Sequence, residues 1–184
     1  MTRFLKLFFF SLLVCVLQTE VARYFRIFTV SPDFMIIFLV LLTDEYGLFG
    51  GFVAGALVGL FYDTTTGYAP AINLVIYTFI GYISALIRGG LNNAFRKMKH
   101  KRFLEFAIIT FSMTMVREII YIGYLFLVGA EQGYVTFFRM FVCVILTTVL
   151  VIPAAAAIDL IRRNRQHRKE MREKDAELRR INIK

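Results

Sequence analysis

The chain has 184 residues, of which 58% are hydrophobic and 19% are charged, and its mean hydropathy is +0.65. Soluble domains are about 45–50% apolar and about 25% charged, so this chain has too little polar surface to cover a water-soluble globule. Its 20 Phe and 9 Tyr also exclude a disordered chain. The composition therefore predicts a small, all-α, polytopic membrane protein.

Six apolar segments are candidates for transmembrane helices, because a helix needs about 20 mainly apolar residues to cross a hydrocarbon core of about 30 Å. They cover residues 4–18 (with an extension to 23), 32–43, 47–62, 70–87, 103–128 and 135–161. The sequence thus predicts a six-helix transmembrane domain over residues 1–161, followed by a basic tail over 162–184. A cleavable signal peptide is the alternative for the first segment, but Gln18-Thr19-Glu20 is a poor cleavage site.

Basic residues indicate the orientation of these segments. Eighteen of the 22 Lys and Arg residues lie at the N-terminus, in the 88–102 connection or in the tail, all on one side of a six-helix arrangement. The positive-inside rule then predicts that both termini are cytoplasmic. The net charge of +9 is concentrated beside apolar segments, so we expect the tail to bind anionic lipid rather than nucleic acid.

Two helix-related patterns stand out in the first half of the chain. Ser31-Pro32-Asp33 resembles a helix start, with Ser31 as N-cap, Pro32 at the first helical position and Asp33 in the first turn. A stripe of small residues follows at every fourth position: Gly47, Gly51, Gly55 and Gly59. Such a stripe allows close approach of another helix in lipid. It is interpreted either as packing within the bundle or as a docking face for a partner's transmembrane helix.

Several polar residues share a depth near the outer side of the predicted bundle. This outer polar cluster comprises Asp33, Asp63, Asn73, Arg117 and Glu118. Charges at such depth usually pair with one another or face water. Because adjacent helical residues point about 100° apart, we expect Arg117 to pair not with Glu118 but with an acid on another helix, first of all Asp63. The pair is either structural or part of a pocket that opens outward.

Catalytic and metal-binding motifs are missing from the sequence. Cys15 and Cys143 lie in apolar segments without metal-ligand spacing, and His100 and His167 lie in basic stretches outside them. No metalloprotease, Cys-x-x-Cys or Walker motif is present, so we expect no cofactor and no enzyme activity. Intramembrane hydrolysis by Asp33 and Asp63 is a minor alternative that requires the two carboxylates within a few ångströms.

The motif residues between 32 and 82 resemble the MreD family of bacterial rod-shape-determining membrane proteins. The resemblance is carried, in chain order, by Pro32-Asp33-Phe34, Gly47, Gly51-Phe52, Gly55, Gly59-Leu60, Asp63, Gly67, Asn73-Leu74 and Gly81-Tyr82. It covers about a third of the chain, and the rest agrees only in hydropathy. Tyr68-Ala69-Pro70-Ala71 departs from the family's usual Pro-Leu-Gly type of turn.

This resemblance implies a non-enzymatic scaffold in the inner membrane, within the peptidoglycan machinery of cell elongation. The implied partner is MreC, and the MreB filament, RodA and the elongation transpeptidase are indirect partners. The family is similar in fold to the membrane substrate-binding subunits of vitamin transporters, which gives the alternative function. Against that alternative, residues 4–17 lack the alanine stripe with which such subunits dock their motor.

Overall fold

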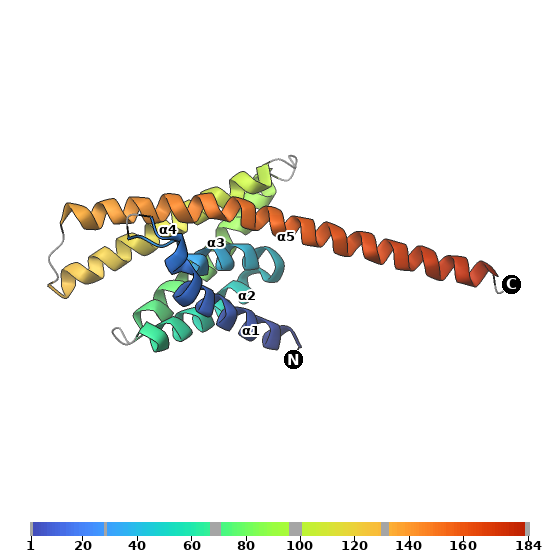
Figure 1. Ribbon diagram of the computed structural model, residues 1–184, viewed down its shortest axis with the longest axis horizontal. Coiled ribbons are helices and arrows are strands. Elements are labelled where there is room, and N and C mark those ends of the chain that lie inside the picture. The colour runs from blue at the N-terminus through green and yellow to red at the C-terminus, as the bar shows by residue number, and fades with distance from the viewer. Residues whose placement is uncertain (1, 28, 67–70, 96–100, 130–132, 183–184) are drawn as a thin grey trace.

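The computed structural model describes residues 2–27, 29–66, 71–95, 101–129 and 133–182, which are almost entirely helical. Helix α1 (Thr2–Val16) continues through a π-helical turn (Leu17–Val21) and a 3-10 turn (Ala22–Phe25). Helices α2 (Phe34–Thr66), α3 (Ile72–Phe95), α4 (Lys101–Leu127) and α5 (Tyr134–Asn182) follow, with α5 the longest by far (Figure 1). Of the residues that carry the MreD resemblance, Gly67 lies outside the described ranges, as does Pro70 in the departing turn.

The described part of the chain contains five α-helices, not six, because α2 includes both the second and the third predicted segments. These two parts nevertheless run in opposite directions. Arg88 and Tyr77 of α3 reach Val40 and Asp33, so α3 is parallel to the first part of α2. The glycines of the second part meet α3 in the reverse order. Helix α2 therefore folds back on itself.

Gly47 is the point at which α2 reverses. Its φ of 65° and ψ of −157° are non-helical and lie in a region that only glycine enters readily. A Cβ atom at Gly51 would lie 2.8 Å from the Thr43 side chain, whereas eight residues of straight helix span about 12 Å. Gly47 thus serves the turn. Nothing lies within 4 Å of a Cβ atom added there, so the predicted packing of Gly47 within the bundle, alongside Gly51, Gly55 and Gly59, is wrong.

Gly47→Ala should lower the free energy of unfolding by about 1–3 kcal/mol, because alanine is strained at this backbone conformation although nothing lies within 4 Å of the added methyl group. Thermal unfolding in detergent, followed by circular dichroism, measures the effect. Gly89→Ala is the matched control: Gly89 is exposed within α3, has open space around it, and gains helix propensity from alanine. Equal melting temperatures for the two variants would contradict the role given to Gly47.

Gly51, Gly55 and Gly59 pack directly against the backbone of α3. A Cβ atom at these positions would collide with the carbonyl oxygens of Gly81, Tyr77 and Asn73, respectively. Gly81 in turn has no room for a Cβ atom because of the carbonyl oxygen of Gly51. The stripe is therefore a packing face within the chain, and α3 occupies the groove that a partner helix would need.

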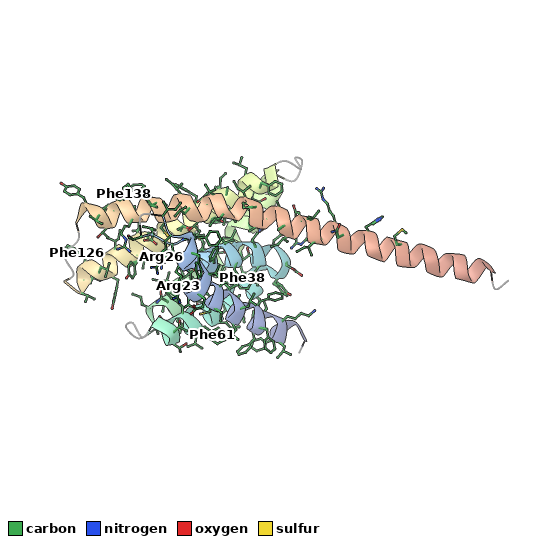
Figure 2. All side chains as sticks on the ribbon, in the orientation of Figure 1. Arg23, Arg26, Phe38, Phe61, Phe126 and Phe138 are labelled. Carbon is green, nitrogen blue, oxygen red and sulfur yellow. The ribbon has the colours of Figure 1, made fainter. Side chains whose placement is uncertain are left out.

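Four helical stretches in the described ranges are long and apolar enough to cross a membrane: Phe4–Phe25, Phe34–Thr65, Ile72–Gly90 and Tyr134–Asn164. Helix α4, which carries Arg117 and Glu118, is not among them. Large apolar side chains are exposed on these helices and on α4, as at Phe126, which is 75% exposed (Figure 2). Such a surface is unfavourable in water and is compatible with a membrane protein.

Helix α5 continues without interruption past residue 161, where the sequence predicted the end of the transmembrane domain. Pro153 lies inside it, and the helix runs on to Asn182, well beyond the other helices (Figure 1). The tail over 162–182 is thus helical and is the direct extension of the last apolar segment.

Candidate functional site

Asp33 lies at the centre of the buried polar contacts. Its Oδ1 accepts hydrogen bonds from the backbone N–H groups of Met35 (3.0 Å) and Ile36 (3.1 Å), which makes Asp33 the N-cap of α2. The Thr147 hydroxyl of α5 accepts a bond from the Asp33 backbone N–H at 3.0 Å. The side chain is almost fully buried, with 3% of its surface exposed.

The second carboxylate oxygen of Asp33 joins α2 to α3 and α4. The Tyr77 hydroxyl donates to Oδ2 at 2.9 Å, and Nε of Arg117 lies 3.6 Å from the same oxygen. Arg117 also bonds Glu118 and lies 5.6 Å from the centre of the Tyr121 ring. A single carboxylate therefore fixes the start of one helix and the positions of two others.

The prediction that Arg117 pairs with an acid on another helix is confirmed by Asp33, but the choice of Asp63 as that acid is wrong. The expectation that Glu118 is not a partner of Arg117 is also wrong. Adjacent side chains leave a helix about 100° apart, but this angle does not determine where the ends of long side chains lie. Arg and Glu side chains are long enough to curve towards each other, and burial of Glu118 favours the contact with Arg117.

Asp63 has a different role, at the start of α3. Its Oδ2 accepts from the backbone N–H of Leu74 at 2.8 Å, and its Oδ1 accepts from the Asn73 backbone (3.2 Å) and side chain (2.8 Å). These bonds satisfy N–H groups at the helix N-terminus, which have no partners within the helix. The predicted outer polar cluster thus divides into an Asp33–Arg117–Glu118 group and an Asp63–Asn73 pair.

The predicted helix start is displaced by two residues. Ser31 is not the N-cap and Pro32 is not the first helical residue, because α2 begins at Phe34 after the Asp33 cap. The Ser31 and Pro32 carbonyls accept bonds from Cys143 Sγ (3.7 Å) and the Gln18 side chain (3.1 Å). This segment is therefore held by α5 on one side and by the extension of α1 on the other.

A second charged group lies where α2 reverses, and the sequence analysis missed it. Arg88 is 7% exposed; its Nη2 lies 2.9 Å from Asp44, its Nη1 donates to the Val40 carbonyl, and Glu105 is 3.9 Å away. Arg162 of α5 also binds Asp44, at 2.5 Å. In the sequence, Arg88 follows an apolar segment and is grouped with the basic 88–102 connection, and only the fold brings Asp44 to it.

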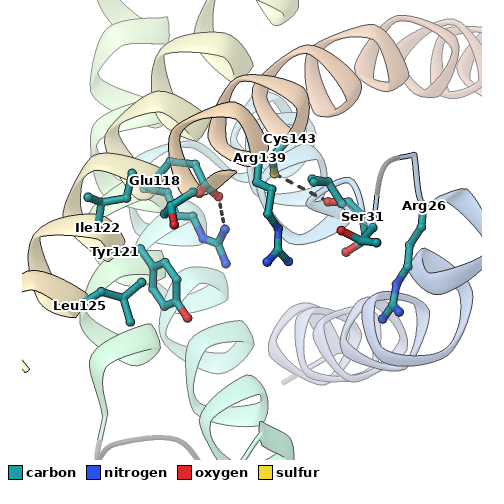
Figure 3. Close-up of a pocket in the computed structure, with 12 residues that line it drawn as sticks. Arg26, Ser31, Glu118, Tyr121, Ile122, Leu125, Arg139 and Cys143 are labelled. Atoms are coloured by element: carbon teal, nitrogen blue, oxygen red, sulfur yellow. Dashed lines mark hydrogen bonds and ion pairs between the residues drawn. The ribbon is translucent and has the colours of Figure 1, made fainter. Parts of the chain in front are cut away.

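A cavity of about 350 Å³ lies next to the Asp33–Arg117–Glu118 group. It is bounded by α4, by the start of α5 and by the segment that precedes α2 (Figure 3). Arg117 and Glu118 line it, together with Arg26 and Arg139. Its volume is in the range of small-molecule sites. The similar depths of polar residues in the predicted helices indicate a polar pocket on this side. Arg26 lies in a connection between helices and is therefore not part of the predicted outer polar cluster.

The two aspartates of the predicted outer polar cluster lie in separate sets of contacts. Asp33 and Asp63 cap different helices, and neither is among the other's hydrogen-bonding partners. Within the described ranges, no three His, Cys, Asp or Glu side chains are grouped so as to hold a metal ion. Comparison of the chain with protein-family models, curated proteins and solved structures finds no match.

Proposed function

We propose that the chain is a non-enzymatic scaffold subunit of the cell-elongation machinery, as the resemblance to the MreD family implies. The observation that supports this proposal is that the residues carrying the resemblance are used to build the α2–α3 unit. Asp33 and Asp63 cap helices, and Gly51, Gly55, Gly59 and Gly81 form the close contact. These contacts make the motif part of a rigid framework, and the scaffold role itself follows from the resemblance to the family.

The proposed topology is six crossings of the bacterial inner membrane, with both termini in the cytoplasm. The two antiparallel parts of α2 count as two of the six crossings, and α4 as another. The long basic continuation of α5 then lies on the cytoplasmic side, where anionic lipid attracts it.

The proposed partner is MreC, which binds through its transmembrane helix. Because α3 fills the glycine groove, we expect MreC to dock elsewhere, on an outward-facing apolar surface of the bundle. The exposed residues Phe10 of α1, Phe79 of α3 and Phe141 of α5 represent three such surfaces.

Photo-crosslinking from these three positions tests the proposal in cells that produce the chain together with tagged MreC. A crosslink to MreC is expected from at least one of them and not from Met171, which is exposed but lies on the tail. Depletion of the chain should also abolish rod shape. If no position crosslinks to MreC and the cells keep their shape, the scaffold proposal is wrong.

The cavity favours a second candidate, a substrate-binding membrane subunit of a small-molecule transporter such as a vitamin transporter. A cavity of about 350 Å³ that is bounded by α4 and α5 could enclose one ligand. A vitamin that co-purifies with the full chain, identified by mass spectrometry, would support this candidate over the scaffold.

A further inference from the structure

The cavity beside Glu118 combines an open space with an excess of positive charge. Among the described residues, three guanidinium groups line it, those of Arg26, Arg117 and Arg139, against the carboxylate of Glu118. They come from three separate parts of the fold: the connection before α2, the middle of α4 and the start of α5. In Figure 3 the Arg139 side chain extends into the space between Glu118 and Tyr121 on one side and Arg26 on the other.

Among the described residues, Arg117 is the one cavity arginine that forms an ion pair. Arg117 is paired with both Asp33 and Glu118, and Glu118 is used in that same pair. Across the described ranges, no carboxylate lies within 4 Å of Arg26 or Arg139. Among the described residues, the exposed Arg26 and Arg139 guanidinium groups therefore line a common cavity with no carboxylate in ion-pair range, and they can bind an anion there.

The cavity also has an apolar side. Ile122 and Leu125 of α4 line it, and the next residues of that helix, Phe126 and Leu127, are 75% and 85% exposed. Charged groups and a bare apolar surface thus lie next to each other at the end of the α4–α5 pair. This arrangement suits an amphiphile whose anionic group enters the cavity while its apolar chains follow the helix surface.

We propose that this cavity binds a phosphate group, supplied by an anionic phospholipid headgroup or by a soluble phosphate ester. Guanidinium groups match phosphate because their planar N–H donors form two parallel hydrogen bonds to its oxygens. Arg26 and Arg139 provide these donors, and the Arg117–Glu118 pair holds the cavity's inner wall. The inference goes beyond the scaffold function, because it depends on the charges around the cavity and not on any protein partner.

Native mass spectrometry of the full chain in non-ionic detergent tests this site with three probes. Phosphatidylglycerol contains phosphate and acyl chains, diacylglycerol contains only the chains, and glycerol 3-phosphate contains only the phosphate. Saturable binding of phosphatidylglycerol but not of diacylglycerol is expected. If glycerol 3-phosphate binds as tightly as the lipid, the phosphate comes from a soluble ester; if it binds far more weakly, the lipid is the source.

Charge variants then locate the binding. Arg139→Gln and Arg26→Gln should each weaken binding about 10-fold or more, since each removes a charge-assisted hydrogen bond. Arg23→Gln is the matched control, because Arg23 is an exposed cation three residues from Arg26 that pairs with Glu20 and does not line the cavity. Melting temperatures close to that of the unmodified chain would show that the variants fold.

Three results would overturn the phosphate site. One is the absence of saturable binding by both phosphate-containing probes. Another is equal binding of diacylglycerol and phosphatidylglycerol, which would assign the affinity to the acyl chains. The third is an equal loss of binding in the Arg23→Gln and Arg139→Gln variants, which would indicate non-specific attraction to a basic surface.

Discussion

Asp33→Ala is expected to lower the free energy of unfolding by about 3–5 kcal/mol, the range for removing one member of a buried ion pair. The variant would leave two N–H groups of α2, the Tyr77 hydroxyl and the Arg117 guanidinium without this acceptor. Glu118 would still pair with Arg117. It would not replace Asp33 as the acceptor for the N–H groups at the start of α2. Thermal unfolding of the purified chain in detergent measures the loss.

Asp33→Asn separates the contributions of charge and capping. Asparagine is a good N-cap and can accept from the backbone of α2, but it carries no charge to pair with Arg117. We therefore expect a melting temperature between those of the unmodified chain and Asp33→Ala. Glu20→Ala is the control for the loss of an exposed acid, and should cost less than about 1 kcal/mol. An Asp33→Ala variant as stable as Glu20→Ala would show that the buried contacts contribute little.

The helical, membrane-compatible class of the fold could be predicted because composition and the hydropathy of each segment do not depend on which helices contact one another. Helix capping was predictable only approximately. Asp33 was recognised as part of a helix start, but its place as the cap depends on which backbone N–H groups the carboxylate faces. Gly47 shows the same limit, since its four-residue spacing from Gly51 matches the stripe while its backbone makes the turn.

The partners of the buried charges could not be predicted, because they depend on how the helices pack. Similar depths suggested Asp63 for Arg117, but Asp63 is used at the start of α3 and Asp33 is brought to Arg117 by α2. Tyr77 takes part both in the buried polar group around Asp33 and in the glycine contact between α2 and α3, and nothing in the sequence indicates this. Its hydroxyl reaches Asp33, and its carbonyl faces Gly55, so the polar group and the glycine contact meet at one residue of α3.

Gly55→Ala should therefore damage more than local packing. The added methyl group would overlap the Tyr77 carbonyl, which is backbone and cannot rotate away, so α2 and α3 must separate. Overpacking of this kind costs about 1–3 kcal/mol. Gly123→Ala is the control, since Gly123 is exposed on α4 with nothing within 4 Å, and alanine there should be neutral or slightly stabilising.

A double-mutant cycle can show whether the glycine contact also positions the Tyr77 hydroxyl. If separation of α3 weakens the bond to Asp33, then Tyr77→Phe should destabilise the Gly55→Ala chain less than it destabilises the unmodified chain. Additive losses would mean that the glycine stripe and the Asp33 group act independently. A coupling of about 0.5 kcal/mol or more would instead show that close packing of α2 on α3 holds the buried polar group in register.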